Sequence, residues 1–219
     1  MNTKKVYEHI CVWLKEYSSR SKTDGYVIGI SGGIDSAVTS TLGASTGLPV
    51  ICIEMPIHQK EDQQKRAKNH IKWLKNRFDN IKSIEIDLSP VFDTFRKQLP
   101  KKTIINELSL ANTRSRLRMT ALYCIAQQNN YLVLGTGNKV EDFGIGFFTK
   151  YGDGGVDISP IADLLKSEVY QLSKFLNINK DIITAAPTDG LWEEDKTDEE
   201  QIGASYTELE WAMRFEGDN

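Results

Sequence analysis

Short apolar runs alternate along the chain with longer segments in which apolar residues recur at helical spacing. The runs are rich in Val, Ile and Tyr and are bounded by Gly, Pro or Asn, which is typical of buried strands. In the first helical segment Val6, Ile10, Leu14 and Tyr17 share one face. The pattern predicts strands over 26–30, 50–55, 81–88 and 131–134, and helices over 3–19, 35–45, 61–77, 90–98 and 108–128.

Strands that are separated by helices favour a parallel sheet with helices on both faces, a doubly wound α/β fold. Ligands of such sheets bind at the carboxyl ends of the strands, where the strand order reverses. We therefore expect the ends of the first and fourth strands, Ser31 and Thr136, to be neighbours. Residues 142–219 read as loops and helices, and we expect residues 1–219 to form a single domain.

Composition and charge narrow the function classes. The 219 residues carry a formal net charge of −3, which argues against a general nucleic-acid binder. We expect no nucleic-acid partner and no membrane association, because no run is apolar enough to span a bilayer and residues 1–20 are charged rather than a signal peptide. Three scattered cysteines, Cys11, Cys52 and Cys124, fit a reducing compartment, so a cytoplasmic location is expected.

The turn after the first strand has the composition of an anion-binding loop. Backbone N–H groups at a helix start have no intrahelical partner, and Gly32 and Gly33 leave them accessible to phosphate. Ser31 and Ser36 add hydroxyl donors. Asp35 would repel phosphate, which suggests a bridging Mg²⁺. The alternative is a Gly-Gly helix entry capped by Ser and Asp. The loop has neither the GxxxxGK[ST] nor the GxGxxG pattern.

Two further stretches suit a second wall of the same site. Residues 135–141 form a Gly-Thr-Gly turn with Thr136, and Glu141 could share Mg²⁺ with Asp35. Residues 147–157 carry three glycines within four positions and predict a mobile loop. Lys150, Asp153 and Asp157 bracket that loop, although a plain flexible connection is the alternative.

Taken together, these motifs resemble the ammonia-dependent NAD synthetases, a family of ATP pyrophosphatases with an adenine nucleotide alpha hydrolase-like fold. The resemblance extends from about Gly25 to Trp211. Besides the opening loop it takes in the Gly-Thr turn, the string Phe147 to Asp157, Pro160, Lys166, Ala186-Pro187-Thr188, Leu191-Trp192, Thr197 to Gly203 and Tyr206.

The resemblance implies an activity and a set of roles. The family converts deamido-NAD to NAD with ATP, Mg²⁺ and ammonia through an adenylated carboxylate, releasing AMP and pyrophosphate, and is homodimeric. It implies Asp35 and Glu141 as Mg²⁺ ligands and Lys150, Asp153 and Lys166 as catalytic residues, with Asp153 our candidate to bind ammonium. Implied ATP contacts are Gly29, Ile30, Ser31, Gly32, Gly33, Ile34, Asp35, Ser36, Thr136, Lys166 and Thr188. Implied deamido-NAD contacts are Arg116, Lys150 and Asp157.

Several alternatives stay open. Lys166 could be a solvated lysine at a helix start, and residues 188–203 a plain acidic surface loop. The family's C-terminal His-Lys pair is not present in this chain, and the spacing from Glu141 to Lys150 is slightly longer than usual. Competing functions are the amidating half of GMP synthetase, a tRNA-modifying pyrophosphatase and a non-catalytic nucleotide-binding module.

Overall fold

A parallel four-stranded sheet organises the computed structural model, which describes residues 1–100, 106–188, 190–192 and 196–215. The strands are β1 (Gly25–Gly29), β2 (Val50–Glu54), β3 (Ile81–Glu85) and β4 (Tyr131–Val133), in the order β3-β2-β1-β4. Beyond β4, Leu134 forms one further parallel bridge with Ile158. The strand order reverses between β1 and β4, so the predicted doubly wound topology is confirmed, and Ser31 and Thr136 follow adjacent strands.

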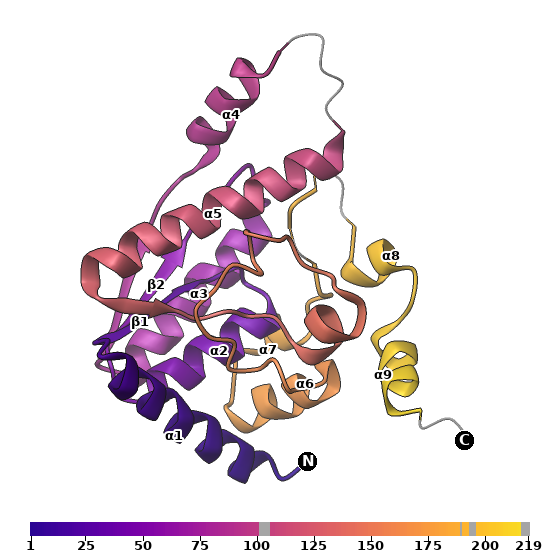
Figure 1. Ribbon diagram of the computed structural model, residues 1–219. Coiled ribbons are helices and arrows are strands. Elements are labelled where there is room, and N and C mark those ends of the chain that lie inside the picture. Colours follow the sequence, from indigo (N-terminus) through magenta and orange to yellow (C-terminus); the bar gives the residue numbers. More distant parts are fainter. Residues whose placement is uncertain (101–105, 189, 193–195, 216–219) are drawn as a thin grey trace.

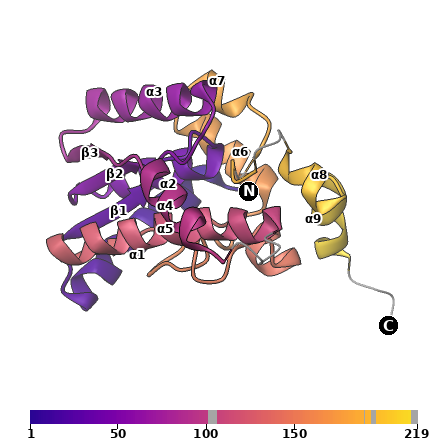
Figure 2. The same cartoon turned by 90° about the horizontal axis from the view of Figure 1, so that it is seen from above.

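Helices cover both faces of the sheet (Figures 1 and 2). Two long ones, α3 and α5, lie on opposite sides of it. The helices are α1 (Thr3–Ser21), α2 (Ile34–Ser45), α3 (Glu61–Arg77), α4 (Ser89–Gln98), α5 (Glu107–Asn129), α6 (Lys166–Phe175), α7 (Lys180–Ile183), α8 (Asp198–Ile202) and α9 (Tyr206–Arg214), with a π-helix, η1 (Lys139–Ile145).

Alternation along β1 builds two separate cores. Tyr26 and Ile28 pack in the larger cluster with α1, α2, α3 and α6, whereas Val27 joins the cluster beneath α4 and α5. All three side chains are fully buried. Because both faces of β1 are buried, the strand is apolar throughout, as expected for the centre of a parallel sheet.

The predicted elements are confirmed with small changes at their ends. The third strand ends at Glu85 rather than residue 88, because Asp87 turns the chain into α4 by accepting a hydrogen bond from Ser89 N (2.9 Å). The fourth strand ends at Val133. Residues 139–145 form a helix that the pattern did not predict. The rest of 142–215 is loop-rich and helical where the structure describes it, and Tyr206 packs in a small third cluster with Val140 and Leu165.

Candidate active site

A cavity of about 520 Å³ opens at the carboxyl ends of β1 and β4. One part of its lining is the complete β1–α2 loop, residues 29–36, together with Thr136 and Glu141. Another part comes from α5 and from residues 146–149, 152 and 153, and a third from residues 185–188, 191 and 192. Segments far apart in the sequence therefore meet at the strand ends, where the topology places a ligand.

The β1–α2 loop presents the backbone start of α2 to this cavity. Gly33 is the N-cap of α2 and has no side chain to occupy the first N–H groups of that helix. Gly32 has φ +84°, and a Cβ there would lie 2.6 Å from the carbonyl oxygen of Gln63 in α3. Both the backbone angle and the close approach of α3 therefore require glycine at position 32.

The two serines of the loop brace each other. Ser36 Oγ donates to the carbonyl oxygen of Gly33 (3.0 Å) and accepts from Ser31 N (3.3 Å). Ser31 Oγ lies 3.1 Å from Ser36 Oγ and accepts from Gly33 N (3.2 Å). The loop is thus held in a shape that leaves the start of α2 open to an anion.

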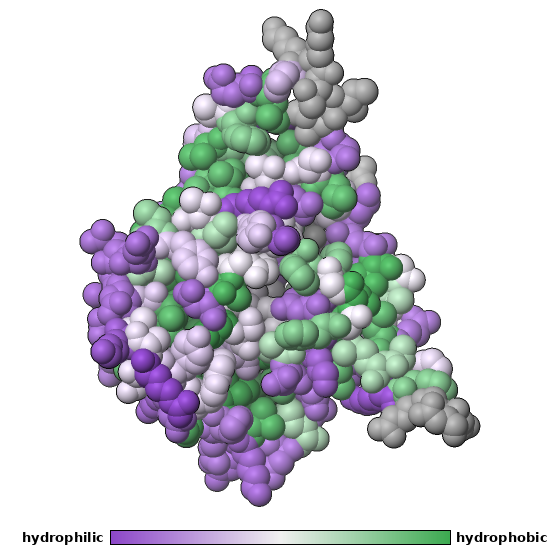
Figure 3. Space-filling model, viewed as in Figure 1, coloured by the Kyte–Doolittle hydropathy of each residue, from purple (hydrophilic) through white to green (hydrophobic). Residues whose placement is uncertain are grey.

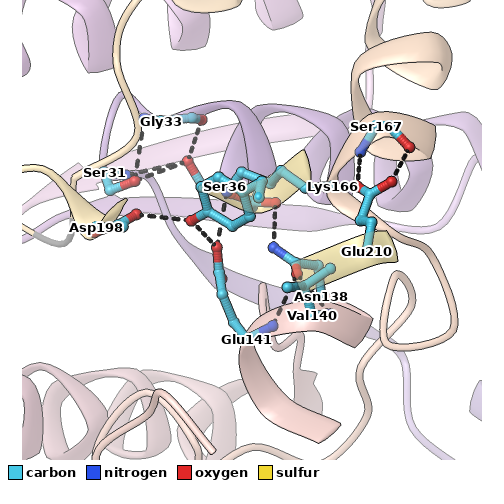
Figure 4. Close-up of polar contacts among 12 residues, drawn as sticks. Ser31, Gly33, Ser36, Asn138, Val140, Glu141, Lys166, Ser167, Asp198 and Glu210 are labelled. Carbon is cyan, nitrogen blue, oxygen red and sulfur yellow. Dashed lines mark hydrogen bonds and ion pairs between the residues drawn. The ribbon is translucent and has the colours of Figure 1, made fainter. Parts of the chain in front are cut away.

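Lys166 joins the two predicted metal ligands (Figure 4). Its Nζ lies 2.7 Å from Asp35 Oδ2 and 2.9 Å from Glu141 Oε1, and its side chain is 2% exposed. The solvated alternative is therefore wrong. Lys166 lies behind the two carboxylates, which line the cavity while the lysine does not.

The electrostatics of this trio follow from burial and pairing. Burial alone would lower the pKa of Lys166, but Asp35 and Glu141 outweigh it and raise that pKa, so the ammonium stays charged. Burial raises the pKa of Asp35, an effect that Lys166 only partly offsets. Burial would also raise the pKa of Glu141, but Lys166 and the hydrogen bonds of its carboxylate bring that pKa below its ordinary value. Two carboxylates on one ammonium leave a net negative charge beside the phosphate loop.

Residues outside the predicted set hold this trio in place. Asn138 donates to Asp35 Oδ1 (3.2 Å), and its Oδ1 accepts from the N–H groups of Val140 and Glu141 (3.1 Å each). It thereby caps η1, the helix that carries Glu141. Tyr206 donates to Glu141 Oε1 (2.6 Å). The only sequence signal for these two roles was the position of Asn138 after a glycine turn and of Tyr206 within a family motif.

Asp142 is a further cavity residue that sequence reasoning did not select. Burial, followed by the neighbouring Glu141, Asp153 and Asp35, raises its pKa to about 6. A Cβ on Gly137 would collide with the Asp142 carboxylate. Glycine at 137 therefore makes room for an acid that adds negative charge to the same side of the cavity.

The glycine-rich stretch is a tightly bonded turn, contrary to the predicted mobile loop. Asp153 Oδ1 accepts from Ser115 Oγ (2.6 Å) and from Thr149 N (3.0 Å), and Asp153 N donates to Ser115 Oγ (2.8 Å). Thr149 Oγ1 donates to Asn112 Oδ1 (2.7 Å). The turn is therefore fastened to α5, and Asp153 faces the cavity.

The three residues predicted to contact deamido-NAD lie outside the cavity lining. Arg116 is exposed and donates from Nε to the carbonyl oxygen of Lys150 (3.2 Å), and Lys150 Nζ lies 5.0 Å from the centre of the Tyr151 ring. Asp157 accepts from Tyr123 OH (3.0 Å) and from Val133 N (2.8 Å). The structure thus brings Arg116 and Lys150 together on the surface, next to the turn, and gives Asp157 contacts to α5 and β4.

Arg114, two residues before Arg116, is buried rather than solvated. It is 3% exposed, lies 4.5 Å from the centre of the Phe92 ring and donates to the carbonyl oxygen of Leu191 (2.9 Å). Leu191 and the predicted ATP contact Thr188 both line the cavity. Residues 189 and 193–195 of the predicted acidic loop lie outside the described residues, while 198–202 form α8.

The parallel sheet leads through a glycine-rich loop into the start of α2, next to two carboxylates and a lysine. This combination is typical of an α/β nucleotide-binding enzyme of the ATP pyrophosphatase type. The comparisons with known proteins make this more specific. The chain belongs to the NAD synthase family, whose model matches residues 6–218.

Similar proteins support this membership. The NH₃-dependent NAD⁺ synthetase of Mesoplasma florum is 40% identical over 213 residues, covering 96% of this chain and 84% of that protein. A solved NMN synthetase from Francisella tularensis is 34% identical, with a TM-score of 0.91 over 100% of this chain and 89% of that chain. The NH₃-dependent NAD synthetase of Campylobacter jejuni, solved with a nitrate ion, is also 34% identical, with a TM-score of 0.75 over 84% of this chain and 77% of that chain.

Proposed function

We propose that this chain amidates deamido-NAD to NAD with ATP and ammonia. A carboxylate oxygen of the nicotinate attacks the α-phosphorus of ATP, and the bond to the bridging oxygen breaks to release pyrophosphate. Ammonia then attacks the acyl carbon, and AMP leaves with that carboxyl oxygen. The observation that carries the proposal is one cavity lined both by the phosphate-type loop at Ser31 and by the turn that holds Asp153.

The loop residues supply the phosphate site. The backbone N–H groups of residues 32–36 and the hydroxyls of Ser31 and Ser36 bind ATP phosphates, chiefly the leaving pyrophosphate. Gly33 N would exchange its bond to Ser31 Oγ for one to phosphate. Gly29, Ile30, Thr136 and Thr188 line the same cavity and contact the rest of ATP. Lys166 partly offsets the negative charge of Asp35 and Glu141 beside the phosphates and keeps these paired acids in place.

Asp35 and Glu141 fit a Mg²⁺ ion that ATP itself would complete. Mg²⁺ binds through one or two carboxylates plus phosphate and water oxygens. Both acids line the cavity, and Lys166 Nζ bonds one carboxylate oxygen of each. Among the described residues no group of three or more His, Cys, Asp and Glu forms a metal cluster. When bound, Mg²⁺ would neutralise phosphate charge.

Asp153 is the proposed ammonium-binding residue. Ammonium has no lone pair with which to attack, so a carboxylate beside the acyl phosphate promotes loss of its proton. Oδ1 is occupied by Ser115 and Thr149, which orients the carboxylate rigidly. We expect Asp153→Asn to raise the ammonium concentration needed for half-maximal turnover at least tenfold. An unchanged ammonia dependence would exclude this role.

The acid substrate has a second candidate. The Francisella NMN synthetase aligns over the whole chain with a TM-score of 0.91. We therefore consider the corresponding mononucleotide acid as an alternative substrate. The surface pair Arg116 and Lys150, outside the cavity lining, supports the larger dinucleotide, because its second nucleotide would extend to them.

One product assay separates these functions. The protein is incubated with ATP, Mg²⁺ and ammonium and with each acid in turn, and the products are separated. AMP and NAD in equal yield support the proposal, and NMN from the mononucleotide supports the second candidate. ADP would exclude the adenylation mechanism. GMP from xanthosine monophosphate would support the GMP synthetase alternative, and binding without turnover a nucleotide-binding module.

We further propose a homodimer of single-domain chains, residues 1–219, working in the cytoplasm. Exposed apolar side chains gather over α4 and the start of α5, including Val91, Phe95 and Leu108 (Figure 3). This surface supports association through those helices. In the described part of the chain, no helix is both long and apolar enough to cross a bilayer. Size-exclusion chromatography with light scattering tests the dimer.

A further inference from the structure

The side chain of Tyr206, at the start of α9, contacts both Glu141 and Lys166. Its hydroxyl donates to Glu141 Oε1 (2.6 Å) and lies 3.3 Å from Asp198 Oδ2, and its ring centre lies 4.7 Å from Lys166 Nζ. Tyr206 is 8% exposed. The side chain therefore touches a carboxylate and an ammonium of the proposed active site without lining the cavity itself.

One turn further along α9, Glu210 fixes the helix that carries Lys166. Its Oε1 accepts from Ser167 N (2.7 Å) and its Oε2 from Ser167 Oγ (2.6 Å). Ser167 is in the first turn of α6, next to Lys166, where backbone N–H groups lack intrahelical partners. Residues four apart share one helix face, so Tyr206 and Glu210 extend from the same side of α9. Figure 4 shows Glu210 against Ser167, beside Lys166.

We propose that Tyr206 and Glu210 are positioning residues for the amidation, through which α9 sets the places of Glu141 and Lys166. The hydroxyl of Tyr206 restricts Glu141 to one rotamer, and its ring confines the ammonium of Lys166 between the two carboxylates. Glu210 holds the backbone next to Lys166. An electrostatic site acts by presenting charge already in position, so a loosened lysine or glutamate lowers kcat more than substrate binding.

Tyr206→Phe is the direct test, because it removes the hydroxyl and keeps the ring. This kinetic test rests on the proposed function, because it measures turnover in the amidation. A hydrogen bond to a charged group is strong enough that we expect kcat to fall about tenfold or more, with KM for ATP changed less than about twofold. A kcat within about twofold of the wild type would overturn the proposal for Tyr206.

Tyr26→Phe is the matched control. Tyr26 is also buried, and its hydroxyl donates to the carbonyl oxygen of Leu14 (2.9 Å) in the core between α1 and the sheet. This variant loses the same atom, although from a bond to a neutral carbonyl rather than to a carboxylate, and it should lower Tm while leaving kcat and KM unchanged. Equal kinetic losses in both variants would show a general stability effect and contradict a positioning role.

Glu210 offers a graded test. Glu210→Ala removes both bonds to Ser167, whereas Glu210→Gln keeps an oxygen that can accept from Ser167 N. We expect kcat to drop about fivefold or more in the alanine variant and to recover most of that loss in the glutamine variant. A kcat that is unchanged in Glu210→Ala, or equally low in both variants, would contradict the assignment.

A double-mutant cycle tests the contact between Tyr206 and Glu141 by thermal stability, without an activity assay. Tyr206→Phe is combined with Glu141→Gln, and Tm is measured for both single variants and the pair. Because the side chains touch, their Tm shifts should be non-additive, whereas those of Tyr26→Phe and Glu141→Gln should add. Additive shifts for Tyr206 and Glu141 would overturn the inference. A wild-type protein that forms no amide would instead refute the proposed function.

Discussion

A buried histidine between α2 and α3 should make the stability of this protein depend on pH. His70 is fully buried, and its Nε2 lies 2.9 Å from Ser40 Oγ. Since Ser40 Oγ also donates to the carbonyl oxygen of Ala37 (3.1 Å), the imidazole donates from Nε2. Its Nδ1 is buried and has no hydrogen-bond partner among the residues that the structure describes, and the ring stacks on Trp73 at 5.6 Å. Protonation would therefore place a charge in an apolar contact.

The size of the loss in the free energy of unfolding follows from the pKa of His70. Burial lowers the pKa of His70 from 6.5 to about 4. The neutral form is favoured in the folded state, so this contribution is complete above pH 6.5 and is lost as the pH falls from 6.5 towards 4. At about 1.4 kcal/mol per pKa unit, the full loss is on the order of 3 kcal/mol. Between pH 7 and pH 5 it is about 2 kcal/mol.

Urea unfolding at pH 7 and pH 5 measures this loss. Other groups also titrate, so the comparison is with His70→Gln, which should lose about 2 kcal/mol less than the wild type over the same interval. His9→Gln is the matched control, because His9 is exposed on α1, and it should keep the wild-type pH dependence. If His70→Gln lost as much stability as the wild type, or if His70 titrated near pH 6.5 by NMR, the reasoning would be refuted.

Two further changes test the cavity. Gly32→Ala combines φ +84° with a Cβ 2.6 Å from the backbone of α3, so we expect a loss of about 2 kcal/mol or more in the free energy of unfolding and weak ATP binding by calorimetry. Gly47→Ala, with φ +79° and open space, should lose only about 1 kcal/mol, and equal losses would contradict the packing explanation. Lys166→Met leaves Asp35 and Glu141 uncompensated, which raises their pKa values in the folded state. The variant should lose about 3–5 kcal/mol at pH 7 in urea unfolding and recover part of it near pH 5, whereas an equal loss at both pH values would falsify the charge argument.

Local patterns were enough to predict the sheet and the position of the site. The apolar alternation of Tyr26, Val27 and Ile28 reports burial on both faces of β1, and the glycines that follow mark the helix entry. Since parallel strands end at one edge, Ser31 and Thr136 could be placed together from the sequence. Family membership, predicted from separate motifs in the right order, is confirmed by the match over residues 6–218.

The topology places strand ends together, but the side-chain partners of residues outside those ends could not be predicted. Lys166 meets Asp35 across 131 positions, and Tyr206 meets Glu141 across 65. No local periodicity indicates such a pairing. From the sequence, Lys166 could therefore be interpreted equally well as a site residue or as a solvated surface lysine. The glycine-rich turn was expected to move because glycines are flexible, yet Asp153 and Ser115 fasten it. A side chain's partner, rather than its type, determined each of these outcomes.

The bridge between Leu134 and Ile158 joins the two ends of the segment 135–157, which carries Glu141 and Asp153. Because the chain leaves and rejoins the same edge of the sheet, a residue inserted in segment 135–157 changes that segment without shifting the strands. The wide turn of η1, where Gly146 N donates to Glu141 O, is the kind of local rewinding that takes up one extra residue. Relatives could thus differ in length between Glu141 and Lys150 while their cores superimpose.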